Sequence, residues 1–237
     1  MGHRGDRVTT RRALVTGASS GIGAAVVGAL VKRGWHVVGL ARRDLDPSVT
    51  VDGTVTGVRC DVGDPAALAD ALTAAGPVDA VVHAAGFQVS AHLGELDLDA
   101  GASMWRVHVG AAEQLLDSAA RSMPDGGRVV LIGSRTMTGA AGKAQYAATK
   151  AALTGLARSA AVELMGRRIT VNVVAPGPTA TPMLDDPARS ATPVRVPPMG
   201  RLIEPAEIAA TVAFLLDEHA GSITGQTLVQ CAGASLT

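Results

Sequence analysis

The chain of 237 residues carries 21 basic and 21 acidic side chains, and apolar residues make up 47% of it but aromatic residues only 2%. This length predicts one α/β domain, and this composition predicts a core of Ala, Val, Leu and Ile. The balanced charge argues against a nucleic-acid binder. The sequence has neither an apolar run of about 18 residues nor a signal-like N-terminus. We therefore expect a cytoplasmic protein without a membrane segment.

Residues 1–12 are expected to form a basic N-terminal arm in front of a single domain that covers residues 13–237. The arm carries Arg4, Arg7, Arg11 and Arg12. Charge clusters at chain ends are usually solvated, so we favour a solvated tail over an anion-binding arm.

The first regular element is a strand followed by a glycine-rich turn. The apolar run that begins at Ala13 leads into TGASSGIG (residues 16–23), and a helical stretch over 24–33 closes at Gly34. Glycines let backbone N–H groups approach a pyrophosphate, and the N-terminus of a helix favours its charge. The G-x-x-x-G-x-G spacing therefore predicts a phosphate cradle, rather than glycines that only form a tight turn.

The second predicted strand, over 35–40, ends beside the residues that select the cofactor. In a Rossmann-type fold a carboxylate here binds the ribose 2′-OH of NAD(H), whereas an arginine accommodates the 2′-phosphate of NADP(H). Arg42 and Arg43 follow this strand, and a guanidinium binds phosphate through paired hydrogen bonds. NADP(H) is therefore favoured, while Asp44 leaves NAD(H) possible.

Strands and helices go on alternating toward the C-terminus. A third apolar run ends at Cys60, where Asp61 is placed to accept from an adenine amino group, and Asp64 is the predicted N-cap of the next helix. Further strands are expected over 79–83, 128–132, 169–174 and 228–230, and helices over 101–123 and 145–165. This alternation predicts a Rossmann-type α/β fold, a doubly wound parallel β-sheet with helices on both faces.

The sequence predicts no metal site. Cys60 and Cys231 lie far apart without C-x-x-C spacing, and His83 has no partner at metal-ligand spacing. Each cysteine is expected to be a small buried hydrophobe, and His83 a hydrogen-bonded structural histidine.

The candidate catalytic residues lie between the fifth strand and the helix that follows it. Tyr146 and Lys150 are four residues apart, so they share one face of a helix. A nearby ammonium favours the phenolate and brings a tyrosine toward useful acid–base chemistry. Ser134, at the end of the preceding strand, is placed to hydrogen-bond a substrate carbonyl or hydroxyl.

These motifs resemble those of the short-chain dehydrogenase/reductase family, in its single-domain branch, and are similar to those of its ketoreductases of the 3-oxoacyl-ACP reductase type. The resemblance runs from Ala13 to the C-terminus. It rests on TGASSGIG, on Ser134 with Tyr146 and Lys150, on NVVAPGPTATPM (172–183), and on the segments 200–201, 205–209 and 223–226.

The resemblance implies a role for each matching residue. Tyr146 would be the general acid in ketone reduction and the base in alcohol oxidation, Lys150 would lower its pKa and hold the nicotinamide ribose, and Ser134 would orient the substrate oxygen. Implied cofactor contacts are Gly17, Ser19, Ser20, Gly21, Ile22, Gly23, Arg42, Arg43, Asp61, Val62, Ala84, Ala85, Gly86, Tyr146, Lys150, Pro176, Gly177, Thr179 and Thr181.

Two histidines stand where the family usually has asparagine. His83 begins HAAG in place of Asn-Asn-Ala-Gly, and His108 occupies the position of a fourth catalytic residue. That asparagine is thought to support a helix kink whose main-chain carbonyl holds a water in the proton relay to the lysine. A carbonyl survives the substitution, so we expect a working but altered relay with His108 in the catalytic set.

Residues 183–200 have no clear periodicity, and by the resemblance they form a short substrate lid over an open pocket; an unstructured surface connection is the alternative. Several side chains are candidates for the substrate side of the pocket. They are Phe87, Gln88, Met137, Met183 and Met199.

The sequence predicts an NADP(H)-dependent ketoreductase or alcohol dehydrogenase that acts on a small carbonyl or alcohol substrate, with a 3-oxoacyl or polyketide-like ketone as one possibility. The alternatives are an NAD(H)-dependent alcohol dehydrogenase and a dinucleotide-binding regulator with weak turnover. The intact Ser134, Tyr146 and Lys150 favour the enzyme, because a regulator has no need of them. The resemblance also implies a homotetramer, or a homodimer. The balanced charge and the lack of a long apolar run predict no nucleic-acid or membrane partner.

Overall fold

A computed structural model describes residues 10–46 and 53–236, and the positions of Arg4 and Arg7 in the expected arm lie outside these residues. Within them the chain forms a seven-stranded sheet in the order β3-β2-β1-β4-β5-β6-β7, and every neighbouring pair is parallel. The predicted doubly wound sheet is confirmed. The strands are β1 (Arg12–Thr16), β2 (His36–Ala41), β3 (Val55–Arg59), β4 (Ala80–His83), β5 (Arg128–Ile132), β6 (Thr170–Pro176) and β7 (Thr227–Gln230).

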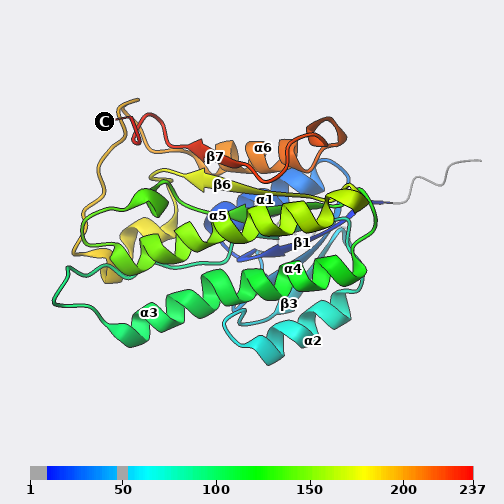
Figure 1. Ribbon diagram of the computed structural model, residues 1–237, viewed down its shortest axis with the longest axis horizontal. Helices are drawn as coiled ribbons and strands as arrows, with labels where there is room; N and C mark the ends of the chain where they lie inside the picture. The colour runs from blue at the N-terminus through cyan, green and yellow to red at the C-terminus, as the bar shows by residue number, and fades with distance from the viewer. Residues whose placement is uncertain (1–9, 47–52, 237) are drawn as a thin grey trace, which may run out of the picture.

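Helices cover both faces of the sheet (Figure 1). One face carries α1 (Gly21–Val31) and α6 (Pro205–Leu215); the other carries α2 (Pro65–Ala75), α4 (Ala111–Ser122) and α5 (Ala144–Leu164), with α3 (Leu98–Trp105) leading into α4. None of the described helices is both long enough and apolar enough to cross a membrane.

The central strands are apolar on both sides because both faces of the sheet are covered. Successive residues of a strand point to opposite faces. In β1, Leu14 packs in the core under α2, α4 and α5, whereas Val15 packs in the core under α1 and α6. Both side chains are at most 1% exposed, which explains why β1 shows no polar alternation in the sequence.

The carboxyl ends of all seven parallel strands lie at one edge of the sheet. The strand order reverses between β1 and β4, and such a reversal opens a crevice at the ends of the two strands. Thr16 ends β1 and His83 ends β4, so the glycine-rich turn and the HAAG segment leave the sheet side by side.

The helix predicted over 101–123 is interrupted. A π-helical turn at Arg106–Gly110 separates α3 from α4. A π-turn leaves carbonyl groups without their usual partners and is common at functional sites. The other predicted elements are present, with ends that differ by a few residues; β3, for example, ends at Arg59, before Cys60.

Two of the arginines expected in the N-terminal arm pack against the domain. The Arg11 guanidinium lies 4.3 Å from the centre of the Trp35 ring. Arg12 begins β1, and its side chain donates to the carbonyls of Ala75 and Pro77 at 2.8 Å each. The first strand therefore starts inside the expected arm.

Candidate active site

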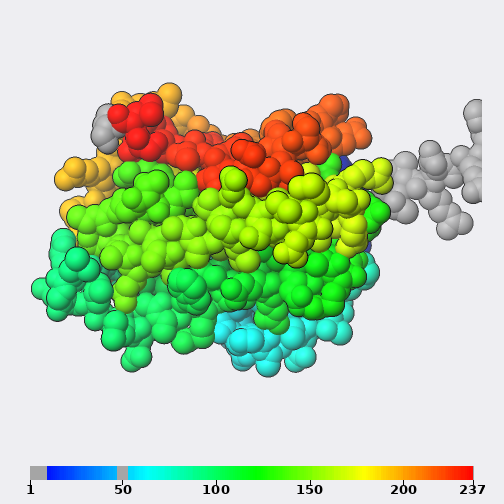
Figure 2. All heavy atoms as spheres, in the orientation of Figure 1, coloured from blue at the N-terminus to red at the C-terminus, as the bar shows by residue number. Residues whose placement is uncertain are grey.

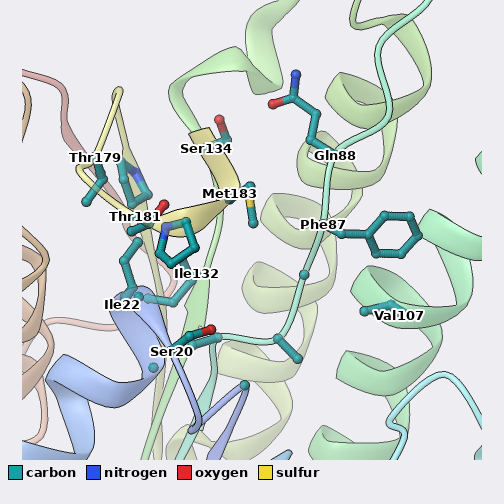
Figure 3. Close-up of a pocket in the computed structure, with 18 of the residues that line it drawn as sticks. Ser20, Ile22, Phe87, Gln88, Val107, Ile132, Ser134, Thr179, Thr181 and Met183 are labelled. Atoms are coloured by element: carbon teal, nitrogen blue, oxygen red, sulfur yellow. The ribbon is translucent and has the colours of Figure 1, made fainter. Parts of the chain in front are cut away.

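A cleft of about 490 Å³ lies at the carboxyl edge of the sheet. In Figure 3, Ser20 and Ile22 lie at one end of it and Ser134 and Gln88 at the other. The lining includes Ser134, Tyr146, Lys150 and all the expected cofactor contacts. Those contacts are Gly17, Ser19, Ser20, Gly21, Ile22, Gly23, Arg42, Arg43, Asp61, Val62, Ala84, Ala85, Gly86, Pro176, Gly177, Thr179 and Thr181.

The glycine-rich turn is packed too closely for side chains. Gly17 has φ +69°, and a Cβ there would lie 2.8 Å from the backbone nitrogen of Ala85. A Cβ on Gly23 would lie 2.1 Å from the carbonyl oxygen of Gly17. The turn leads directly into α1, whose N-cap Ser20 makes no side-chain hydrogen bond to the helix. The first N–H groups of α1 therefore face the cleft as an anion-binding site.

Two arginines lie at the adenosine end of this cradle. Arg42 and Arg43 follow β2 and line the cleft, and Nη2 of Arg43 is 3.5 Å from Oγ of Ser20. Asp44, the residue that left NAD(H) possible, lies outside the lining. Asp61 lines the cleft, and its Oδ1 accepts from the backbone N–H of Gly63 at 2.9 Å. This end of the cleft suits a nucleotide with an additional phosphate.

The other end of the cleft holds the candidate catalytic side chains. Tyr146 and Lys150 lie one turn apart on α5, with Nζ of Lys150 at 5.8 Å from the centre of the Tyr146 ring. Nζ donates to the Ile132 carbonyl at 2.9 Å, which fixes the ammonium at the end of β5. Ser134 lies just past the end of that strand, and its Oγ is 2.8 Å from Oγ1 of Thr136.

The electrostatics of this pair are dominated by burial. Burial raises the pKa of Tyr146, while the Ser134 hydroxyl and the Arg189 guanidinium act in the opposite direction. Burial also lowers the pKa of Lys150 to about 7. The sequence assigned the lowering of the tyrosine pKa to Lys150, whereas Ser134 and Arg189 have that effect here. Tyr146 is therefore protonated at neutral pH, as a proton donor needs to be.

The sequence missed part of the cleft wall. Arg106, Arg135, Lys143 and Arg189 also line the cleft. Arg135 adjoins Ser134, and Lys143 immediately precedes α5. Their closeness in sequence to Ser134 and Tyr146 could have indicated that both side chains line the cleft. Arg189 lies in the segment expected to form a lid, and no motif marks it.

The candidates for the substrate side divide into two groups. Phe87, Gln88 and Met183 line the cleft as expected. Met137 and Met199 are corrections, because neither lines it. Sδ of Met137 instead accepts from Oγ1 of Thr154 at 3.7 Å, and Met199 is 73% exposed.

Comparison with known proteins identifies the family of the chain. A family model described as enoyl-(acyl carrier protein) reductase matches residues 17–235. The 3-oxoacyl-[acyl-carrier-protein] reductase FabG of Salmonella typhimurium is 38% identical over 231 residues, which cover 91% of this chain and 93% of the reductase. The chain belongs to the short-chain dehydrogenase/reductase family.

Two further members of this family bear on function. A cyclic-di-GMP-binding biofilm dispersal mediator protein of Escherichia coli (strain K12) is 34% identical over 226 residues, covering 92% of this chain and 94% of that protein. The structure of the angucycline C-6 ketoreductase LanV with bound NADP has a TM-score of 0.87 and 29% identity, covering 96% of each chain.

His83, the first departure from the usual family sequence, is a structural histidine as expected. It is 1% exposed, and its Nε2 lies 3.1 Å from the Val107 carbonyl and 3.2 Å from that of His108. Carbonyls only accept, so Nε2 carries the proton and Nδ1 accepts from the Thr16 hydroxyl at 2.8 Å. His83 therefore connects the end of β1 to the π-turn. Burial, then the Lys150 charge, lowers its pKa to about 4.

His108, the second departure, lies outside the cleft lining, on the π-turn. Its Nε2 accepts from the backbone N–H of Phe87 at 3.2 Å, so Nδ1 donates to Oγ1 of Thr149 at 2.8 Å. The Thr149 hydroxyl in turn donates to the Tyr146 carbonyl at 2.8 Å. The imidazole meets the Tyr146 ring edge-on, with ring centres 5.6 Å apart. His108 therefore holds α5 in place, and we place it among the positioning residues.

The His108 carbonyl, at the position that the resemblance assigned to a relay water, accepts from Nε2 of His83 at 3.2 Å. Burial, Lys150 and His83 all lower the pKa of His108, so both imidazoles are neutral at pH 7. Neither histidine belongs to a metal-binding cluster: in the described parts of the chain no group of three or more His, Cys, Asp or Glu is placed to hold a metal ion. Cys60 and Cys231 are both buried, as expected.

The low pKa of His83 makes the folded state sensitive to acid. In the unfolded chain His83 binds a proton at about pH 6.5, whereas in the folded protein it does so only near pH 4. The free energy of unfolding therefore falls as the pH falls between these two values. The loss attributable to His83 is about 3 kcal/mol. His83→Asn should lose less stability than the parent when urea unfolding is compared at pH 6.5 and 4.5.

A matched control is His219→Asn. Asp217 raises the pKa of the exposed His219, so this histidine favours the folded state at low pH. The control should lose at least as much stability on acidification as the parent. If His83→Asn lost as much stability as the parent between pH 6.5 and 4.5, that result would contradict the buried neutral state of His83.

Proposed function

We propose that the chain is an NADP(H)-dependent oxidoreductase that transfers a hydride between the nicotinamide and a ketone or secondary alcohol. One observation carries the proposal. A single cleft contains a phosphate cradle at one end and Ser134, Tyr146 and Lys150 at the other. The cofactor supplies or accepts the hydride when bound, and the protein supplies orientation and a proton.

The residues of the cleft have distinct tasks in this reaction. The Tyr146 hydroxyl gives its proton to the carbonyl oxygen during reduction and takes it back during alcohol oxidation. Its raised pKa keeps that proton available at neutral pH. Ser134 donates to the same substrate oxygen and fixes its direction. The Lys150 ammonium, which donates to the Ile132 carbonyl, would hold the nicotinamide ribose.

The choice of NADP(H) rests on the adenosine end of the cleft. Arg42 and Arg43 both line the cleft there, with Arg43 beside Ser20, and Asp44 lies outside the lining. Guanidinium groups bind a phosphate through paired charge-assisted hydrogen bonds. LanV was solved with NADP, which supports the same choice here.

The similarity to FabG and LanV supports a ketoreductase, with a 3-oxoacyl or polyketide-like ketone among its candidate substrates. The similarity to a cyclic-di-GMP-binding protein supports a second candidate, a nucleotide-binding regulator. The enzyme is the better proposal, because the buried Tyr146 and Lys150 have no task in a regulator.

We also propose that the protein assembles with copies of itself, as a homotetramer or a homodimer. Val162 and Met165 at the end of the α5 segment are 65% and 54% exposed, and Phe214 on α6 and Val229 on β7 are 45% and 46% exposed. Figure 2 shows α4 and α5 uncovered on one side of the molecule. Two apolar surfaces of this kind fit two symmetric interfaces between identical chains.

The proposed reaction makes Tyr146 indispensable for turnover but not for cofactor binding. Tyr146→Phe removes the proton donor and leaves the ring, so we expect ketone reduction to fall by at least about a hundredfold. Loss of NADPH absorbance over a panel of ketones measures this rate, and NADPH fluorescence measures binding.

NADPH affinity should change less than about threefold in this variant, because the lost hydroxyl faces the substrate. Equal reduction rates in the variant and the parent would rule out the mechanism. Tight NADPH binding without turnover of any ketone would favour the regulator instead.

The proposed 2′-phosphate site predicts a difference between the two cofactors. Arg42→Ala should weaken NADPH binding by about tenfold or more while changing NADH binding little, because only NADPH carries the 2′-phosphate. Titration of both cofactors by fluorescence measures the two affinities. Arg33→Ala, which removes an exposed arginine beyond α1, is the matched control and should change neither. Comparable losses for NADPH and NADH in Arg42→Ala would show that this arginine does not bind the 2′-phosphate.

A further inference from the structure

Three cations line the catalytic end of the cleft. Arg135, Lys143 and Arg189, here called the cationic wall, all lie among the lining residues. Arg135 directly follows Ser134, and Lys143 lies three residues before Tyr146. Arg189 reaches the same end from the segment after β6, and its charge lowers the pKa of Tyr146. The wall therefore surrounds the place where the substrate carbonyl would lie, away from the Arg42 end.

Arg189 is an incompletely satisfied buried cation. Its side chain is 9% exposed, and Nη1 donates to the Met183 carbonyl at 3.2 Å. Nε is shielded from solvent and has no hydrogen-bond partner. None of the ion pairs formed within the described residues includes Arg189. A buried charge without a counterion is costly, so this guanidinium is poised for an anionic ligand.

The segment that carries Arg189 is fixed to the wall of the cleft. The backbone N–H of Ser90 donates to the Ala188 carbonyl at 2.9 Å, and the Thr192 hydroxyl donates to Oγ of Ser90 at 2.9 Å. Thr192 also packs against Gly142, where a Cβ would lie 2.6 Å from its methyl group. These contacts hold η7 (Pro187–Arg189) beside Lys143, so Arg189 is preorganised rather than carried on a free loop.

The charges near the wall leave it electropositive. Burial, then Arg189 and Arg135, lowers the pKa of Lys143, so both arginines are within electrostatic reach of Lys143. Asp186 is near Arg189, but its Oδ1 accepts from the backbone N–H of Ala188 at 3.0 Å and it does not line the cleft. Asp61 is the one acidic residue among the described lining residues, and it belongs to the adenine end.

We propose that the cationic wall binds an anionic group of the substrate, a carboxylate or a phosphate, and so selects ketones that carry a negative charge close to the carbonyl. The proposal rests on the proposed reductase function and names its substrate class. Arg189 and Lys143 would pair with the anion while Tyr146 and Ser134 bind the carbonyl oxygen. Two points of attachment would fix which face of the carbonyl receives the hydride.

Matched pairs of ketones test this selectivity. Levulinate and acetylbenzoate are compared with their methyl esters, and acetonylphosphonate with its dimethyl ester, with NADPH at saturation. We expect kcat/KM to be at least about tenfold higher for the anions than for the esters, since a charge-assisted hydrogen bond contributes this much. The carboxylate and phosphonate arms identify which anion fits. Equal or higher values for the esters would overturn the proposal.

Variants locate the effect on the wall. Arg189→Gln and Lys143→Gln should each reduce the preference for anions over esters to about threefold or less, mainly through a raised KM for the anions. Lys143→Gln, which changes a half-buried side chain, remains informative if Arg189→Gln does not fold. Arg195→Gln removes an exposed cation from the same segment and should keep the full preference. A preference retained in both wall variants would place anion binding elsewhere.

A binding measurement separates this proposal from the proposed function. Calorimetric titration of acetylbenzoate into the protein with saturating NADP⁺ reads the anion site without turnover. Binding that weakens by about tenfold in Arg189→Gln or Lys143→Gln, but not in Arg195→Gln, supports the anion site even if no ketone is reduced. In that case only the reductase function fails. Absence of binding to the parent protein, with the esters still reduced, would overturn the anion site and leave the reductase function intact.

Discussion

The hydroxyl of Thr16 ties together the two strands on which the cleft depends. It donates to Nδ1 of His83 and accepts from the backbone N–H groups of Ala84 and Ala85, at 2.8 Å, 3.1 Å and 3.1 Å. These bonds join the ends of β1 and β4 at the point where the strand order reverses. A fully buried hydroxyl with all its hydrogen-bonding capacity used holds the crevice at a fixed width. The glycine turn and the HAAG segment then lie so close together that a Cβ on Gly17 would collide with the backbone of Ala84 and Ala85.

From Thr16 the hydrogen bonds run on to the catalytic helix. Nε2 of His83 donates to two carbonyls of the π-turn, and His108 on that turn reaches Phe87 and Thr149. Thr149 then contacts the carbonyl of Tyr146. The donor and the acceptor of each hydrogen bond in this series are fixed by their neighbours. Each imidazole is therefore held in a single neutral tautomer. The cradle and Tyr146, which lie far apart in the sequence, are therefore positioned by one connected set of buried groups.

What the sequence could predict was local. The phosphate cradle follows from glycine spacing, and the pair of Tyr146 and Lys150 follows from the helical repeat, so neither needed knowledge of distant contacts. The hydrophobic pattern of residues 101–123 did not predict the π-turn, although the resemblance implied a helix kink at His108. Its contact with His83 joins residues 24 and 25 positions apart in the sequence. Arg189 was missed for a similar reason: only the contacts of η7 with Ser90 bring it to the cleft. Met137 and Met199 were misplaced because methionine fills gaps of any shape and gives no directional signal.

Hydride transfer from a nicotinamide held in one orientation is the central claim, and following the hydride itself tests it most directly. NADPH carrying deuterium on one or the other face of its nicotinamide C4 is supplied with a ketone, and the alcohol product is examined by mass spectrometry. The account predicts that one of the two labels transfers its deuterium to the carbinol carbon and that the other transfers none. Product without deuterium from either label, or with equal deuterium from both, would contradict it.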